Sequence, residues 1–238
     1  MNLLLHIAHS FFLGLYITSF ALVVPLGLYA QSVVVDQGTF GLSIHGEKIG
    51  TEDFIIRRAG LGNEAAFISR GVVVRALNGT SEEFTTLLRV TATEGTAAGY
   101  EFKSSRPAPI EIMLNISGPR YFSRFISGEG QEEREFRAER GTRIVEHQVA
   151  HHLYFLGNVL NDSIIHVIEP LSRTDRQFLV SAQQDEEIRL GRNRVVARRV
   201  MFTSADGNRI VWFDRQGRVL RVEIPRIGYL AVREDLVG

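Results

Sequence analysis

Cysteine is absent from the 238-residue chain. Without thiols, neither a disulfide framework nor a lipid-modified lipoprotein N-terminus can form, so the fold depends on its hydrophobic core. A cysteine nucleophile is excluded too, and no serine lies in a Gly-x-Ser-x-Gly turn, the usual signature of acyl-transfer catalysis. Glycine-rich phosphate-binding loops are also missing. We expect a protein that is not an enzyme and needs no cofactor.

Charge is missing from the first thirty residues, Met1 to Ala30, which contain no Asp, Glu, Lys or Arg. The apolar stretch from Phe11 to Leu28 is long for the core of a secretory signal and short for a membrane span. Ala30 offers a small residue at a cleavage position before Gln31. Residues 1–30 are therefore predicted to be a signal helix, with an uncleaved anchor as the alternative because no basic residue precedes the apolar run. We expect export to the periplasm or the cell exterior, with membrane contact only through this segment.

The remainder, residues 31–238, carries 27 basic and 27 acidic residues and is long enough for one domain with a substantial core. This balance gives no overall field toward nucleic acid. The densest basic patch, within residues 192–199, has no interleaved aromatic residues for base stacking, so it indicates a solvated sheet face. No nucleic-acid partner is expected.

Apolar and polar residues alternate with a period of two along most of residues 31–238, as in half-buried strands. The pattern is clearest at 40–45, 110–117, 178–183 and 219–224. Asn78-Gly79 and Asp206-Gly207-Asn208 are typical of tight hairpin turns, which cannot carry the crossovers that parallel strands need. The chain is therefore predicted to be mainly β, with a large curved antiparallel meander.

One segment departs from this alternation. In the range 146–161, Val149, Leu153, Leu156 and Leu160 recur at spacings of four, three and four, the stripe of an amphipathic helix. A single helix must pack its apolar face on something, and a curved sheet offers a concave face. The expected architecture is a half-open barrel with one amphipathic helix as its lid.

Two histidines on that helix are the sharpest candidates for chemistry. His147 and His151 have the i, i+4 spacing of zinc-binding helices and would lie about 40° apart on the side opposite Val149. Gln148 stands where a hydrolytic zinc site needs a carboxylate base, and no third ligand is evident. A structural or surface role is favoured for both, with a metal site at His147 and His151 as the weaker alternative. His152, on the flank of the stripe, is expected to be partly buried.

A ligand cavity is the sharper interpretation of the apolar face that the strands and helix share. Trp212, the only tryptophan, lies in a run that is apolar on both parities, so its strand is predicted to be covered on both faces. Core packing is the simpler reading of the same residues. The cavity candidates are Phe40, Leu42, Ile44, Val149, Leu153, Leu156, Leu160, Trp212, Leu220 and Val222.

The beginning of the domain, 41–50, and the segments 194–198, 209–225 and 232–235 resemble an uncharacterised exported β-domain family of bacteria, found alone or ahead of α/β-hydrolase domains. More distantly, the expected architecture resembles the half-barrel of periplasmic lipoprotein carriers and related lipid-binding proteins. These resemblances imply a fold, and they carry over no catalytic residue.

Three functions follow as hypotheses. The first is an envelope carrier that holds a lipid, a glycolipid or a lipidated protein between sheet and helix. The second is a structural or interaction domain with a filled core that docks another envelope protein. The third is a zinc enzyme that uses His147 and His151. A transmembrane β-barrel is disfavoured by the short turns and the helix in mid-chain.

Overall fold

The computed structural model describes residues 32–236, so the predicted signal segment 1–30 lies outside the described residues. Sixteen strands form one sheet. No helix within 32–236 has the length and apolar character needed to cross a membrane. The strands are β1 Val33–Ile44, β2 Glu47–Ala59, β3 Ala66–Leu77, β4 Thr80–Thr91, β5 Ala97–Arg106, β6 Ile110–Ser117, β7 Arg120–Ser127, β8 Gly130–Arg137, β9 Arg143–Ile144, β10 Ile164–Glu169, β11 Thr174–Ala182, β12 Glu186–Leu190, β13 Asn193–Ser204, β14 Gly207–Phe213, β15 Val219–Ile224 and β16 Tyr229–Arg233.

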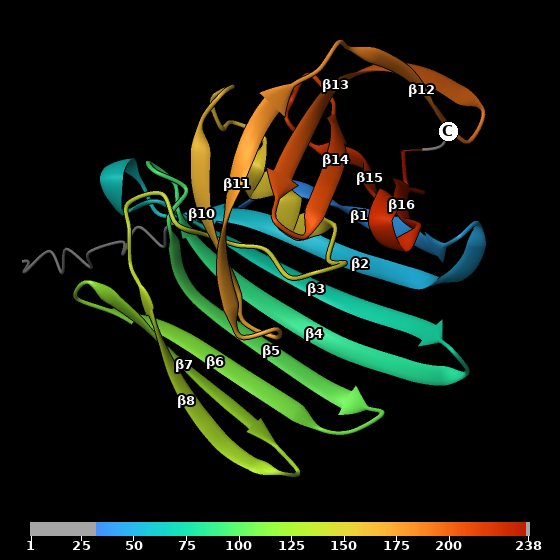
Figure 1. Ribbon diagram of the computed structural model, residues 1–238. Helices are drawn as coiled ribbons and strands as arrows, with labels where there is room; N and C mark the ends of the chain where they lie inside the picture. The colour runs from blue at the N-terminus through green and yellow to red at the C-terminus, as the bar shows by residue number, and fades with distance from the viewer. Residues whose placement is uncertain (1–31, 237–238) are drawn as a thin grey trace, which may run out of the picture.

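The sheet consists of two halves that are joined where the first strand meets the last. β1 to β8 form a meander, β10 to β16 form most of a second one, and β1 pairs antiparallel with β16. In Figure 1 the long strands β1–β8 curve through the lower part, and β10–β16 stand above their concave side. The mainly β, curved and largely antiparallel sheet predicted from the sequence is confirmed, apart from the short parallel β9–β10 pair.

Hairpin turns occur where the sequence predicted them. Asn78 and Gly79 have φ of +51° and +77° between β3 and β4, and Gly207 has φ of +111° between β13 and β14. These are left-handed conformations that Gly and Asn adopt at low cost. The four clearest alternating segments lie in β1, β6, β11 and β15.

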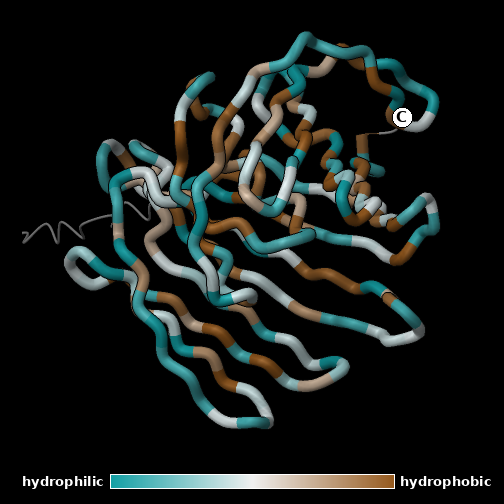
Figure 2. Tube along the Cα trace, in the orientation of Figure 1, coloured by the Kyte–Doolittle hydropathy of each residue, from teal (hydrophilic) through white to brown (hydrophobic). Residues whose placement is uncertain are grey.

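The core lies between the two halves of the sheet. Side chains from the concave face of β1–β8, from β10, β11 and β13–β16, and from the segment 144–156 form one buried cluster. Apolar stretches follow the strands in Figure 2, while the hairpin turns are largely polar. A second, smaller cluster lies on the other face of β14 and β15, where Ile188 and Leu190 of β12 cover Trp212 and Leu220. The prediction that the Trp212 strand is covered on both faces is confirmed, since Val211, Trp212 and Phe213 are all buried.

The predicted helix over 146–161 is wrong in extent and type. Helical residues there are confined to the 3-10 helix η2, His151–Leu156. The other short helices within 32–236 are η1, Gly62–Glu64, and η3, Pro225–Ile227. A left-handed residue, Gln148 at φ +62°, interrupts the segment before η2. Figure 1 shows η2 between the two halves of the sheet, so it is part of the core and does not lie over it as an exposed lid.

The free edge of β8 faces the turn between β10 and β11. Arg134 of β8 donates a hydrogen bond of 2.6 Å to the backbone oxygen of Arg173, and the Arg173 guanidinium lies 2.5 Å from Glu132. The Arg173 side chain also lies over the ring of Phe125, 4.9 Å from its centre. Side-chain contacts therefore link the edge of β8 to the β10–β11 turn, although these two elements are not paired as strands.

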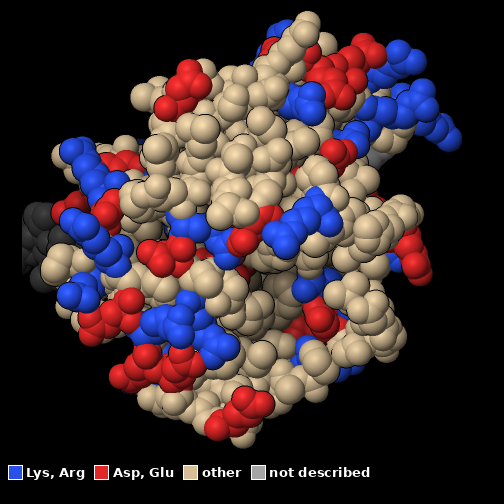
Figure 3. All heavy atoms as spheres, in the orientation of Figure 1, with Lys and Arg blue, Asp and Glu red and all other residues tan. Residues whose placement is uncertain are grey.

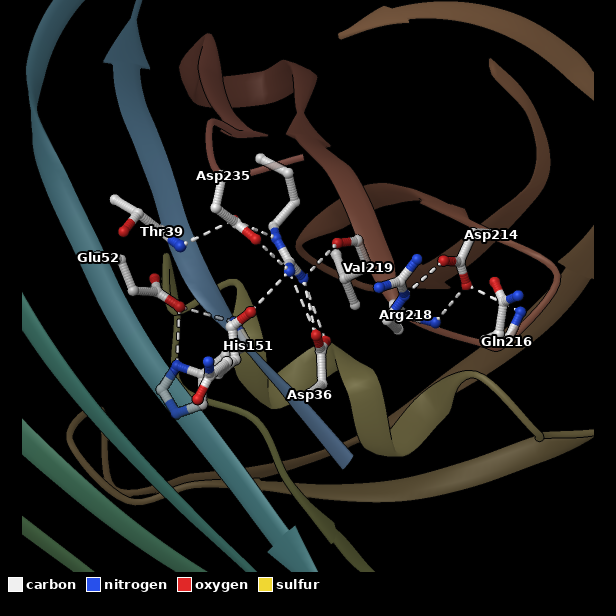
Figure 4. A network of polar contacts seen from close by, with 11 residues as sticks. Asp36, Thr39, Glu52, His151, Asp214, Gln216, Arg218, Val219 and Asp235 are labelled. Atoms are coloured by element: carbon white, nitrogen blue, oxygen red, sulfur yellow. Dashed lines mark hydrogen bonds and ion pairs between the residues drawn. The ribbon is translucent and has the colours of Figure 1, made fainter. Parts of the chain in front are cut away.

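A buried arginine holds the two ends of the domain together. Arg233 of β16 is 1% exposed and binds both carboxylate oxygens of Asp36 in β1, at 3.1 and 3.3 Å, and Asp235 at 2.8 Å. Its guanidinium lies over the rings of Phe40 and Phe54. Figure 4 shows the contacts that surround Asp36 and Asp235. Burial raises the pKa of Asp36 despite the nearby cation, and the two carboxylates raise the pKa of Arg233 despite burial.

Candidate functional site

The two histidines predicted as a metal pair take part in separate contacts. His151 is fully buried, and its Nδ1 lies 2.7 Å from Glu52 Oε1. His147 is exposed, and its Nδ1 accepts a hydrogen bond from Arg209 Nη2 at 3.1 Å. The predicted i, i+4 geometry fails because η2 begins only at His151 and Gln148 turns the chain between the two rings. Within residues 32–236, no three His, Cys, Asp or Glu side chains lie together as a metal site would need.

Glu52 binds the start of η2 from the concave face of β2. Its Oε2 accepts the N–H of Ala150 at 2.9 Å, and its Oε1 accepts both the N–H and the Nδ1–H of His151 at 2.7 Å. On the other side of the ring, His151 Nε2 lies 3.4 Å from Thr86 Oγ1 in β4. Figure 4 shows Glu52 and His151 directed toward each other. One carboxylate therefore satisfies three donors of a segment about a hundred residues away, which is how buried polar groups are stabilised.

A glycine makes room for this imidazole. Gly71 of β3 pairs with Phe54 on one side and Thr86 on the other. A Cβ at Gly71 would lie 2.3 Å from His151 Cε1, far inside van der Waals contact. The Phe54 ring stacks against the imidazole with 5.6 Å between ring centres. The slot over Gly71 thus fixes where η2 packs on the sheet.

The carboxylate, imidazole and hydroxyl of Glu52, His151 and Thr86 form a row like that of a nucleophilic hydrolase, but all three residues are buried. Thr86 is 2% exposed, and Glu52 and His151 are 0% exposed. A nucleophile must reach its substrate, so a sealed hydroxyl cannot serve as one in this conformation. The arrangement fits a packing role for the row.

Glu146 is a second buried carboxyl, at the end of the β9 segment. Its Oε1 accepts the N–H of Leu171 at 2.9 Å, and its own N–H donates to His152 Nδ1 at 3.2 Å. Burial raises the pKa of Glu146 to about 8, and the negative charge of Glu169 adds to this shift. Burial also holds the pKa of His152 well below its usual value, so this imidazole is neutral. The predicted partial burial of His152 is exceeded, since it is fully buried.

We expect stability to fall as pH rises through neutrality because of Glu146. The folded chain keeps this carboxyl protonated up to a pKa of about 8, whereas an unfolded glutamate has a value near 4.5. The folded state therefore binds more protons in this window, and stability is lost toward pH 8. Substitution Glu146→Gln should make the chain relatively more stable by about 2 kcal/mol between about pH 6 and about pH 7.5.

Urea unfolding at the two pH values measures this difference, and Glu129→Gln, at an exposed carboxyl, is the matched control. Equal pH slopes for the natural chain and Glu146→Gln would show that Glu146 is ionised in the fold.

A charged pocket lies near Glu146, at the end of β10. Glu169 is 1% exposed, and Arg209 of β14 and Arg176 of β11 each bind one of its oxygens, the latter at 3.0 Å. Arg176 also pairs with Asp206 in the β13–β14 turn. The pocket above these groups has a volume of about 430 Å³, and His147 lines it. Figure 3 shows acidic and basic side chains close together around a hollow near the middle of the face.

The ten cavity candidates lie mostly in packed positions. Phe40, Leu42, Val149, Leu153, Leu156 and Val222 belong to the main cluster, and Trp212 and Leu220 to the second one. Ile44 is half-buried against the main cluster, and Leu160 is 78% exposed because the chain leaves the core after η2. Five pockets of 220 to 570 Å³ are lined by other residues.

Sequence reasoning missed Glu52, Gly71, Glu146, Glu169 and Arg233. The alternation of apolar and polar residues along the strands could have indicated some of them. Glu52 shares the inward parity of Phe54 and Ile56, and Arg233 shares that of Tyr229 and Ala231. A charged residue on an apolar parity indicates a buried polar contact, because an unpaired buried charge is too costly to keep.

No family model and no curated protein matches the chain. Among solved structures, a similar fold occurs in a protein from Brucella abortus described as a β-barrel-like protein of a domain of unknown function, DUF1849. The two share a TM-score of 0.52 and 7% sequence identity, over 86% of this chain and 96% of the other. At this identity the likeness concerns the fold alone. The chain therefore has a β-barrel-like fold that is shared with a protein of unknown function.

Proposed function

We propose that this chain is an exported, non-enzymatic interaction domain of the cell envelope whose interior is a structural core. The observation that carries this proposal is the filled space between the two halves of the sheet. Phe40, Leu42, Leu153 and Leu156, all expected to line a lipid cavity under the carrier hypothesis, are at most 2% exposed and pack in one continuous cluster. An acyl chain could enter only by displacing these buried side chains.

Two further observations support the proposal. The uncharged segment 1–30 favours export, and the expected destination is the periplasm or the cell exterior. The row Glu52, His151 and Thr86 is sealed from solvent, which favours a non-enzymatic role for the chain's most catalytic-looking side chains. The expected partner is another envelope protein, which would be recognised by the outer surface of the sheet.

Lipid extraction tests the filled-core reading. The chain is purified from the periplasmic and membrane fractions of a bacterial host without detergent, extracted with organic solvent and measured by quantitative mass spectrometry. We expect far less than one lipid per chain, no more than in a lysozyme sample processed in parallel. About one lipid of a single class per chain would restore the carrier hypothesis. Recovery of the chain only from the cytoplasm would contradict export.

A further inference from the structure

The pocket above Glu169 is assembled from several separate parts of the chain. Glu169 ends β10, Arg209 lies in β14, Arg226 lies in η3, and His147 precedes η2. Its volume of 430 Å³ falls within the range of about 300–1,000 Å³ that small-molecule sites occupy. The proposed role as an interaction domain does not involve this pocket.

The charges around the pocket leave one positive charge over. Three arginines, Arg176, Arg209 and Arg226, face two carboxylates, Glu169 and Asp206. Both oxygens of Glu169 are bound by Arg209 and Arg176, and Asp206 is bound by Arg176. Arg226 donates to the backbone oxygen of Asp206 at 3.0 Å and forms no ion pair with any described residue. The pocket lining therefore carries one excess positive charge, which attracts a monoanion.

Hydrogen-bond donors are also in excess. Arg209 is 6% exposed, and its Nη1 has no partner within residues 32–236; Arg176 Nε likewise has none. His147 Nδ1 accepts a hydrogen bond from Arg209, so its hydrogen is on Nε2, which makes Nε2 a donor. Buried donors without partners are rare in proteins, and an acceptor such as a carboxylate oxygen would satisfy them.

The same pocket has an apolar wall. Ile224 at the end of β15 and Ile227 in η3 line it next to Arg226. A small ion would leave these apolar side chains exposed to water, whereas a ligand with a short apolar chain would cover them. We propose that this pocket binds a small monocarboxylate with a short apolar chain, the carboxylate beside Arg209, His147 and Arg226 and the chain against Ile224 and Ile227.

Hexanoate is a suitable probe, with hexylammonium, hexan-1-ol and inorganic phosphate as matched comparisons. Titrations of the full chain are followed by NMR through the methyl groups of Ile224 and Ile227 and the amides of Gly207 and Asn208. We expect saturable shifts with hexanoate, at a dissociation constant on the order of 1 mM. Binding should be about fivefold weaker or more for hexan-1-ol and for phosphate, and undetectable for hexylammonium.

Two variants locate the carboxylate. Arg226→Gln and His147→Ala change exposed side chains, so the fold should survive, and each should weaken hexanoate binding about fivefold. Arg192→Gln removes an exposed arginine from the β12–β13 turn and should leave binding unchanged. Equal binding of hexylammonium, unsaturable shifts spread over the surface, or unchanged affinity in both pocket variants would overturn the proposal. Phosphate binding as tightly as hexanoate would overturn the apolar half of it.

Discussion

Replacing Arg233 with methionine should destabilise the domain by about 4 kcal/mol, because it leaves Asp36 in the interior without the cation that binds its two oxygens. Asp36 is 5% exposed, and Arg233 supplies three of its hydrogen bonds. Methionine keeps an apolar side chain of similar length but lacks the guanidinium that lies over Phe40 and Phe54, so the loss reports mainly on the missing cation. Urea unfolding, followed by circular dichroism, measures the change.

The double variant Arg233→Met with Asp36→Leu should recover much of this loss, since it removes both charges from the interior. Arg192→Met, at an exposed arginine, is the control for the change of residue type and should be near neutral. The single variant should also lose less stability at acid pH, where burial favours the protonated form of Asp36. A loss that the second substitution makes worse would show that Arg233 acts by packing alone.

The strands and turns of this fold can be predicted from the sequence because each depends on local pattern. Alternation in 110–117 specifies β6, and the two residues Asn78 and Gly79 specify the β3–β4 hairpin. What local pattern cannot specify is which strands close the structure. The pairing of β1 with β16 joins residues nearly two hundred positions apart, and no periodicity encodes it.

The predicted helix failed for a related reason. The stripe of Val149, Leu153 and Leu156 predicts one apolar face, and these three residues are buried. The backbone that buries them is set by tertiary contacts, since Glu52 holds the N–H groups of Ala150 and His151. These contacts override an intrinsic helical preference that is weak in a segment this short.

The candidate site was hardest to predict because its members come from distant elements. The sequence predicts His151 as the partner of His147, but His147 contacts Arg209, 62 residues away. Glu169 has no local motif that marks it. Only the packing of β10, β11 and β14 brings its two arginines to it. The spacing of residues within one segment can therefore indicate a polar side chain of interest, but it does not identify the residues that the side chain contacts.

The slot that receives η2 gives the second large expected effect. Gly71→Ala should destabilise the domain by about 3 kcal/mol, because the new methyl group would lie 2.3 Å from His151 Cε1. The imidazole cannot move aside cheaply, since Glu52 holds its Nδ1 at 2.7 Å and Phe54 stacks on its ring. Urea unfolding gives the free energy, and hydrogen exchange at Ala150 and His151 shows whether the hydrogen bonds to Glu52 open.

Gly128→Ala is the matched control, because Gly128 is an exposed glycine with nothing within 4 Å of an added Cβ. It should change stability by about 0.5 kcal/mol or less. If packing over Gly71 is what seats η2, Gly71→Ala will speed exchange at Ala150 and His151 more than at β6 amides, which lie elsewhere in the sheet. A Gly71→Ala chain as stable as the Gly128→Ala chain, with unchanged exchange at those two amides, would mean that η2 finds its place without the slot. The position of the whole segment 144–156 in the core would then rest on its apolar side chains alone.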